Sequence, residues 1–284
     1  MSRRRAARRG VPTSMALKPI VVIAEKEFWE RIRNRWVLAV ALVFAIFALT
    51  IAYVGTARQG VIGFGGIDVT IASLVSLVVY LVPLIALILG YDAIAGERDR
   101  GSLELLLSMP ITRLELLLGK FCGLAAALAF STLAGFGLAG VVVSYHVGLA
   151  ALYQYAVFLA SALLLGWAFL SLAVMVSVTT RNRIRASGIA IALWFFCVLV
   201  YDLLLLGLVV ASDGRLKRGV LPALLMLNPA DVFRILNIFG MEEVRRIYGL
   251  ATVLPEAMTS PWLMAAALGL WIVAPLAVAT WRFK

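Results

Sequence analysis

Charged residues are scarce in this 284-residue sequence, at 14%, whereas 63% of the residues are hydrophobic. A soluble domain has about a quarter charged and about half apolar residues, so this composition excludes an ordinary water-soluble domain. The apolar residues form long uninterrupted runs, and a run of about 18 or more indicates a membrane-spanning helix. The sequence lacks the strand-like alternation over ~10-residue segments that is typical of an outer-membrane barrel.

Cysteine and histidine are nearly absent: the chain has Cys122, Cys197 and a single histidine, His146. Neither cysteine belongs to a CxxC or Cys/His cluster, which argues against a disulfide framework or a zinc site. An intramembrane protease would need HExxH, or Ser/His or Asp/Asp arrangements within its spans, and the lone histidine argues against one. We therefore expect no catalytic residue in this chain.

Copper binding at His146 is an alternative, because four methionines fall on the same predicted side of the membrane: Met226, Met241, Met258 and Met264. No MxxM or HxxM pair is present, however, and scattered methionine usually fills cores. We expect no metal site in the chain.

The net charge of +11 would suggest nucleic acid in a soluble protein. In a membrane protein, basic residues gather in cytoplasmic loops and face anionic lipid. We therefore expect membrane lipid, and not nucleic acid, as a partner.

The apolar runs predict an all-α integral membrane protein. Residues 1–20 are basic and predict a flexible tail, and residues 21–36 are amphipathic, which is typical of a helix that lies flat in the membrane interface. A six-helix transmembrane domain follows over 37–284, with spans at about 37–55, 70–90, 121–145, 153–178, 188–211 and 262–281. The third and fourth spans hold small residues that let helices approach closely in lipid: Gly135, Gly137, Gly140, Ser161 and Gly166.

Lysine and arginine are unevenly divided between the two sides. With the N-terminus inside, 19 of the 26 lie in inner segments and 7 in outer ones. This bias predicts that both termini are cytoplasmic. It also places segment 91–120 inside and segment 212–261 outside, where Leu227–Phe239 and Met241–Leu250 are each expected to form a short helix.

Segment 91–120 has the clearest local sequence signals of all the connections. Four consecutive charged residues lie at 97–100. Gly101 permits a turn, Ser102 is the expected N-cap of a short helix, and Pro110 should end that helix at Met109.

Thr112 and Glu115 then form a capping box for a second helix, which is expected to run through Lys120 into the third span. The short helix would carry exposed leucines and charges. Such an element suits docking into a groove on a cytoplasmic protein, and the alternative is a loop that rests on lipid headgroups.

A few residues outside this segment also invite a role. Asp202 is an intramembrane acid, either for a substrate or a proton, or as a hydrogen-bond partner for a neighbouring helix; Asp92 is expected to be structural. Arginines alternate in the inner loop 179–187, where they would anchor at headgroups. Gly119 and Gly123 form a GxxxG pair, which is weak evidence for a dimer face.

The stretch from Ile94 to Gly123 resembles the signature of ABC-2-type permeases. The matching positions are Glu97, Gly101, Ser102, Glu104, Leu105, Leu106, Pro110, Ile111, Arg113, Gly119 and Lys120. The resemblance implies that this segment is the coupling helix that sits in an ATPase subunit, and that a second coupling element includes Arg181 and Arg183. The chain has no phosphate-binding loop, since Phe121 follows Gly119-Lys120 where Ser or Thr is required. ATP and Mg would therefore be bound by the partner ATPase, and this chain would hold no cofactor.

Four further blocks, 33–42, 81–97, 201–209 and 227–235, resemble the permeases of the nitrous oxide reductase maturation system. That resemblance implies a homodimer in the bacterial inner membrane, with a cytoplasmic ABC ATPase and a periplasmic β-helical protein as partners. It implies a role in copper-site assembly in a periplasmic enzyme. An ABC-2 exporter of another substrate, or a non-transporting scaffold that links the ATPase to a periplasmic partner, remain the alternatives.

Overall fold

The computed structural model describes residues 17–33, 35–54, 67–147, 149–212, 219–238 and 260–283. Every regular element within these ranges is helical, as the apolar runs predicted. The elements are α1 (Leu17–Arg33), α2 (Trp36–Val54), α3 (Ile67–Gly90), α4 (Ala95–Asp99), α5 (Ser102–Leu107), α6 (Arg113–Val147), α7 (Leu149–Thr179), α8 (Arg183–Phe195), the π-helical turn η2 (Phe196–Val200), α9 (Tyr201–Ala211), α10 (Val220–Met226), α11 (Pro229–Ile238) and α13 (Pro261–Arg282).

Five helical stretches are each long and apolar enough to cross a membrane: Thr70–Asp99, Arg113–Val143, Leu152–Thr179, Arg183–Ala211 and Pro261–Arg282. Two bent pairs meet the same test only when taken together, namely α1 with α2, bent by 64°, and α10 with α11, bent by 108°. The described helices thus support five to seven crossings and a multi-pass membrane protein. The first of the six predicted spans corresponds to α2.

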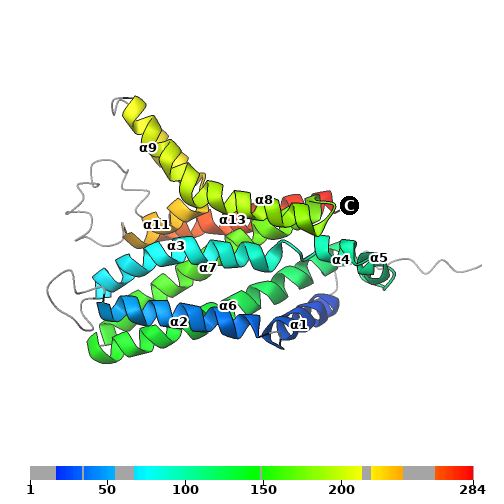
Figure 1. Ribbon diagram of the computed structural model, residues 1–284, viewed down its shortest axis with the longest axis horizontal. Helices are drawn as coiled ribbons and strands as arrows, with labels where there is room; N and C mark the ends of the chain where they lie inside the picture. The colour runs from blue at the N-terminus through cyan, green and yellow to red at the C-terminus, as the bar shows by residue number, and fades with distance from the viewer. Residues whose placement is uncertain are drawn as a thin grey trace, which may run out of the picture.

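The long helices run side by side, and α7 lies at the centre of the bundle, packed against α3, α6 and α13 (Figure 1). Of the residues in an 18-residue apolar stretch of α7, 67% are buried, a larger share than in any other candidate span. Aromatic side chains fill the core around it. Phe44 of α2 stacks on Phe136 of α6 with ring centroids 4.6 Å apart, and Phe158 of α7 packs edge-on against Phe136. The Phe136 ring of α6 therefore contacts both α2 and α7.

Small residues allow α2, α3, α6 and α7 to approach one another closely. A Cβ at Gly135 would lie 2.7 Å from the Ala41 carbonyl oxygen of α2, and one at Gly140 would lie 2.5 Å from the Tyr155 ring of α7. A Cβ at Gly166 would lie 3.0 Å from Leu128 of α6 and 3.1 Å from Val82 of α3, a somewhat looser contact. Gly137 does not fit the expectation, because no atom of the described residues lies within 4 Å of its would-be Cβ.

The beginning of α1 corrects the predicted tail. Residues 17–20 belong to α1 and not to a flexible tail; residues 1–16 lie outside the described residues. Pro19 is tolerated there because the first-turn N–H groups of a helix have no intrahelical acceptor.

The predicted inner loop 179–187 is shorter than expected, because α8 begins at Arg183. Asn182 caps it, and its side-chain oxygen accepts a hydrogen bond from the Arg185 N–H at 2.9 Å. In segment 212–261, α11 matches the predicted helix Leu227–Phe239, and Met241–Leu250 lies outside the described residues.

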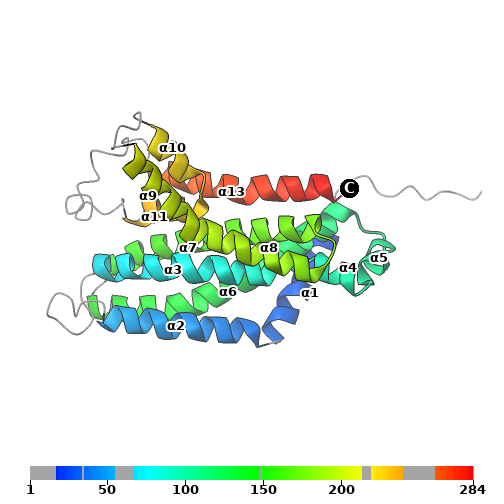
Figure 2. The same ribbon diagram turned by 45° about the horizontal axis from the view of Figure 1, so that its top comes forward.

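Two ends of the bundle can be distinguished in Figure 2. One end holds α1, α4, α5, the start of α8 and the end of α13, and we call it the α5 end. The other end holds α10, α11 and the end of α9 (Figure 2). Residues 91–112 and 180–182, which both carry predicted functional residues, therefore lie at the same end of the molecule.

Candidate functional site

The connection between α3 and α6 is a compact pair of short helices. Gly101 has a φ of 71° and makes the turn between α4 and α5, as expected of a glycine at that position. Ser102 does not cap α5, which corrects the prediction: Gly101 is the N-cap, and the Ser102 hydroxyl donates to the Glu97 carboxylate. The hydroxyl is drawn away from the helix end by the charge of Glu97, since hydrogen bonds to charged groups are the stronger ones.

The start of α6 forms the predicted capping box. The Thr112 hydroxyl accepts from the Glu115 N–H at 3.2 Å, and the Glu115 carboxylate accepts from the Thr112 N–H at 2.7 Å. Pro110 lies in the exposed turn before it, and α5 ends at Leu107, two residues earlier than Met109. A helix of 35 residues thus begins at Arg113, and the signature residues from Arg113 to Lys120 form its first turns at the edge of the bundle.

Lys120 lies at the centre of a buried ionic cluster. Its ammonium Nζ is 2.5 Å from Glu27 Oε1 in α1 and 3.1 Å from Glu97 Oε1 in α4, and its side chain is only 4% exposed. Two of the predicted coupling residues, Glu97 and Lys120, therefore face the interior and bind α1, α4 and α6 to one another. They do not form the outer surface.

Gly119 and Gly123 of α6 form the surface against which α1 packs closely. A Cβ at Gly119 would lie 2.7 Å from Ile23 Cβ, and one at Gly123 would lie 2.5 Å from the Ala24 carbonyl oxygen. The GxxxG pair thus serves packing within the chain, of α6 on α1, in place of the dimer face that it weakly suggested.

The exposed side of the segment carries apolar and charged side chains together. Leu105 is 66% exposed and Met109 is 51% exposed, next to the exposed Glu104. Leu103 is buried and Leu106 packs partly against the main core, so the two faces of α5 differ. Arg113 is exposed, yet its guanidinium donates to the Phe283 carbonyl at 3.2 Å and lies over the Phe283 ring. Arg113 thereby ties the start of α6 to the end of α13.

The end of α7, the 180–182 loop and the start of α8 are hydrogen-bonded directly to this segment. The Ser177 hydroxyl oxygen accepts from the N–H groups of both Ile94 and Ala95 at 2.9 Å, and Arg98 donates to the Thr180 carbonyl. The Asp99 carboxylate accepts from the Arg183 N–H at 2.8 Å. The two predicted coupling elements therefore form one continuous surface.

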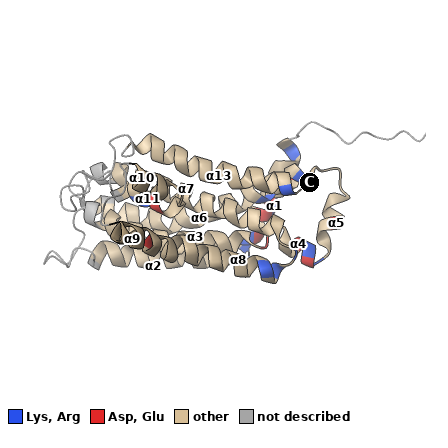
Figure 3. Cartoon of the chain, turned by 90° about the horizontal axis from the view of Figure 1, so that it is seen from above, with Lys and Arg blue, Asp and Glu red and all other residues tan. Residues whose placement is uncertain are grey.

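Arg181 and Arg183 differ in their surroundings. The Arg183 guanidinium lies 3.6 Å from Asp92, which also pairs with Arg31 of α1 at 3.5 Å. The Arg181 side chain is exposed. Asp92 thus links α1 to α8, in line with the structural role expected of it. Figure 3 shows that Lys and Arg of the described chain gather at this α5 end.

Three residues of the site were not predicted from the sequence: Glu27, Ser177 and Arg31, a partner of Asp92. A signal for Glu27 exists, because it lies three, four and seven residues from Ala24, Ile23 and Ile20, on the face of α1 that packs against α6. An acid on an apolar helix face needs a buried cation. Nothing in the sequence alone distinguishes Ser177 from its neighbouring serines.

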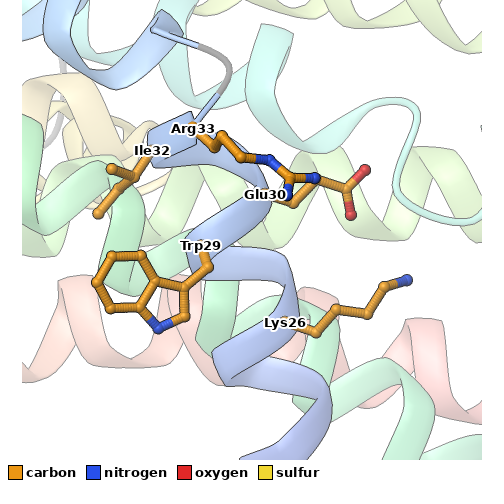
Figure 4. A pocket seen from close by; sticks show the side chains of 5 residues that line it. All are labelled: Lys26, Trp29, Glu30, Ile32 and Arg33. Atoms are coloured by element: carbon orange, nitrogen blue, oxygen red, sulfur yellow. The ribbon is translucent and has the colours of Figure 1, made fainter.

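The opposite face of α1 is open, with a hollow of about 610 Å³ lined by Lys26, Trp29, Glu30, Ile32 and Arg33. Figure 4 shows Trp29 and Ile32 extending to one side of α1 and Lys26 to the other. Trp29 is 59% exposed. This face presents an aromatic ring between charged side chains, a composition suited to a membrane interface.

Asp202 lies away from the α5 end, on α9. Its Oδ2 is 2.5 Å from Nη1 of Arg234 in α11, and its side chain is 35% exposed. The side chain of His146, and Met241 and Met258, lie outside the described residues. Within the described residues, no group of three or more His, Cys, Asp or Glu side chains could hold a metal ion.

Comparison with known proteins agrees with this architecture. The family model for ABC-2 family transporter proteins matches residues 21–284. The chain is 44% identical over 273 residues to the probable ABC transporter permease protein NosY of Pseudomonas aeruginosa, covering 94% of this chain and 98% of that protein. It is 42% identical over 269 residues to the protein of the same name from Stutzerimonas stutzeri, covering 92% and 96%. The chain therefore belongs to the ABC-2 family of transporter proteins, and it is an ABC transporter permease of the NosY type.

Proposed function

We propose that this chain couples ATP hydrolysis by a separate cytoplasmic ABC ATPase to transport or mechanical signalling across the bacterial inner membrane. The observation that carries the proposal is the two-sided character of α5. Its outer face exposes Leu105 and, in the following turn, Met109, whereas Leu103 is buried against the bundle. An exposed apolar helix face flanked by charges is the form of a peptide that docks into a groove on a partner.

The contacts beneath α5 offer a path for movement. A displacement of α4 and α5 acts on Glu97, which shares the Lys120 ammonium with Glu27 of α1. It also acts on the Ser177 hydroxyl through the N–H groups of Ile94 and Ala95. The ATPase would change the state of the spans by binding this surface with different affinity in its open and closed forms.

The ATPase subunit would bind ATP and Mg, and this chain would hold no cofactor. The proposal places α5 and the 180–182 loop in the cytoplasm, together with both termini, because 19 of the 26 Lys and Arg residues lie in segments on that side of six predicted spans. The amphipathic face of α1, with Trp29, would lie in the membrane interface (Figure 4). Two copies of the chain would form a homodimer.

For the process it serves, we propose copper-site maturation of periplasmic nitrous oxide reductase. The support is the similarity over more than nine-tenths of the chain to two proteins named NosY. A periplasmic β-helical protein would be the partner at the end that holds α10 and α11. Export of another substrate is the alternative that the copper content of the reductase tests, and a scaffold without transport is the other alternative.

Substitution of Leu105 tests the docking surface. Leu105→Asp should reduce the amount of ATPase that co-purifies with the tagged full chain by about tenfold or more, because a buried, unpaired charge replaces an apolar contact. The thermal midpoint of the chain alone should not change, since Leu105 is 66% exposed. The matched control is Leu17→Asp, at an equally exposed leucine of the same end, at 76%. Normal ATPase recovery with Leu105→Asp would refute the docking role.

The biological role is tested separately, in cells that lack this chain. Nitrous oxide reductase purified from them should contain less copper per polypeptide than enzyme from the parent strain, and the wild-type chain should restore it. A normal copper content would refute the maturation role and leave export of another substrate. Loss of copper in Leu105→Asp cells would show in addition that the ATPase contact is required for it.

A further inference from the structure

The long helical stretch Arg183–Ala211, which comprises α8, η2 and α9, leaves the bundle halfway along its length. Only 17% of the residues in its 18-residue apolar stretch are buried, whereas 50% or more are buried in the corresponding stretches of α3, α6 and α7. Buried residues occur in its first part, α8, at Ala186 and Ala190, but α9 has none. Figure 1 shows α9 projecting away from α3, α7 and α13. Apolar packing therefore does little to fix the position of α9.

A π-helical turn, η2, lies where the packed part ends and the projecting part begins. A π turn interrupts the regular hydrogen-bond ladder and commonly marks a functional site. The Cys197 carbonyl in this turn accepts a hydrogen bond from the Asn228 side-chain amide at 2.7 Å. Asn228 is buried and belongs to the turn between α10 and α11. The break in the helix is therefore held from outside by another segment.

A chain of polar contacts leads from this turn to α9. The Asn228 amide also donates to Asp231 Oδ2 at 3.0 Å, and Asp231 Oδ1 accepts from Arg234 Nη1 at 3.0 Å. The same Arg234 nitrogen donates to Asp202 Oδ2 of α9 at 2.5 Å. Asp231 is buried, whereas Asp202 is 35% exposed. The inner part of the network is thus fixed in the protein, and its last contact, to α9, is open to the surroundings.

Among the described residues, one other polar contact holds α9 to another helix. The Tyr201 hydroxyl, in the first turn of α9, donates to the Leu224 carbonyl of α10 at 2.6 Å. This contact lies next to η2, so it fixes the base of α9 and not its far end. Segments with few buried apolar contacts separate from a structure at low free-energy cost. An ion pair in a partly apolar setting is then the main restraint, and it is lost as a unit when either partner is neutralised.

We propose that Arg234 is a positioning residue that latches α9 to α11 through Asp202, and that α9 pivots about η2 when this contact opens. Asp231 and Asn228 keep the guanidinium and the π turn in place, so the pivot and the latch are built from one short block, 228–234. The latch belongs to this chain alone and does not depend on the ATPase. It gives the outer half of this span a closed and an open position.

A distance measurement on the full chain, in lipid nanodiscs and without ATPase, tests the latch. Spin labels are placed at Leu206→Cys of α9 and Leu270→Cys of α13, two side chains that are 61% and 67% exposed, in a Cys122→Ser, Cys197→Ala background. Arg234→Gln should broaden the distance distribution and add a separate population. Asp202→Asn should do the same, and the double variant should add nothing further, since each single change already removes the Arg234–Asp202 contact. Arg234→Lys should keep the parent distribution.

A second label pair separates the latch from a general loss of structure. Ile191→Cys of α8, 58% exposed, lies before η2, and its distance to Leu270→Cys should be unchanged in every variant. An unchanged Leu206–Leu270 distribution in Arg234→Gln would overturn the proposal, and so would equal broadening of both pairs. Because the measurement uses no ATPase, failure of the latch leaves the ATPase docking surface untouched, and the converse also holds.

Discussion

The ammonium of Lys120, in α6, lies 2.5 Å from a carboxylate oxygen of Glu27, in α1, and the two side chains are 4% and 7% exposed. Glu97 of α4 approaches the same ammonium to 3.1 Å. Removing each charge from water costs several kcal/mol, which their mutual attraction offsets only while every partner is present. The cluster therefore joins three segments far apart in the sequence in one all-or-none contact, directly under the proposed docking surface.

Replacing the shared cation should destabilise the chain strongly. Lys120→Met leaves the buried Glu27 without its counter-charge and removes the nearer of two cations from Glu97, and removing one partner of a buried pair costs about 3–5 kcal/mol. The expected result is a clear fall in the thermal unfolding midpoint of the purified full chain in detergent, followed by tryptophan fluorescence.

The control for Lys120→Met removes another cation from the same cluster. Arg100 lies 3.7 Å from Glu97, but its side chain is 60% exposed, so Arg100→Gln should cost less than about 1 kcal/mol. The double variant Glu27→Leu, Lys120→Leu should recover part of the loss, because it leaves no unpaired charge on α1. Equal midpoints for Lys120→Met and Arg100→Gln would show that the buried pair does not hold α1.

A second prediction concerns the contact between the α3–α6 connection and α7. The buried Ser177 hydroxyl oxygen accepts from two backbone N–H groups, those of Ile94 and Ala95. Ser177→Ala leaves both donors without a partner in the interior, at about 1–3 kcal/mol each. The thermal midpoint should fall, and hydrogen exchange of residues 91–100 should accelerate more than that of α6.

Ser187→Ala is the matched control for this serine. The Ser187 hydroxyl donates only within its own helix, to the Ile184 carbonyl at 2.9 Å, in an exposed position. Its removal should change stability by less than about 0.5 kcal/mol. If exchange of residues 91–100 stayed at the parent rate in Ser177→Ala, the Ser177 contacts would not fix the α3–α6 connection on α7.

Much of the fold was predictable because long apolar runs have few alternatives in a membrane. The helices α2, α3, α6, α7 and α13 match predicted spans closely. The capping box at Thr112 and Glu115 and the turn at Gly101 were also predictable, since both depend on residues close in sequence. Ser102 was assigned wrongly, because a nearby carboxylate, Glu97, competes for its hydroxyl.

The division of labour within the candidate site was not predictable from one sequence. The signature residues were grouped as a single docking set, yet Lys120 is buried while Leu105 is exposed. The placement of the α4–α5 segment on the bundle depends on partners far along the chain, such as Ser177, which lies 83 residues from Ile94. The π turn at 196–200 was also unforeseeable, because its apolar residues fit a regular helix equally well.

The last prediction compares two glycines of α6 to test the close packing of α1 on this helix. At Gly123 a Cβ would lie 2.5 Å from the Ala24 carbonyl oxygen and 2.7 Å from Glu27 Cβ, whereas at Gly137 nothing lies within 4 Å. Alanine is favoured over glycine in a helix interior by about 0.5–1 kcal/mol, but forcing a methyl group into a tight contact costs about 1–3 kcal/mol. Gly137→Ala should therefore raise the thermal midpoint slightly, and Gly123→Ala should lower it. A rise in both would mean that α1 moves aside freely, and that the buried pair of Lys120 and Glu27 does not fix its position.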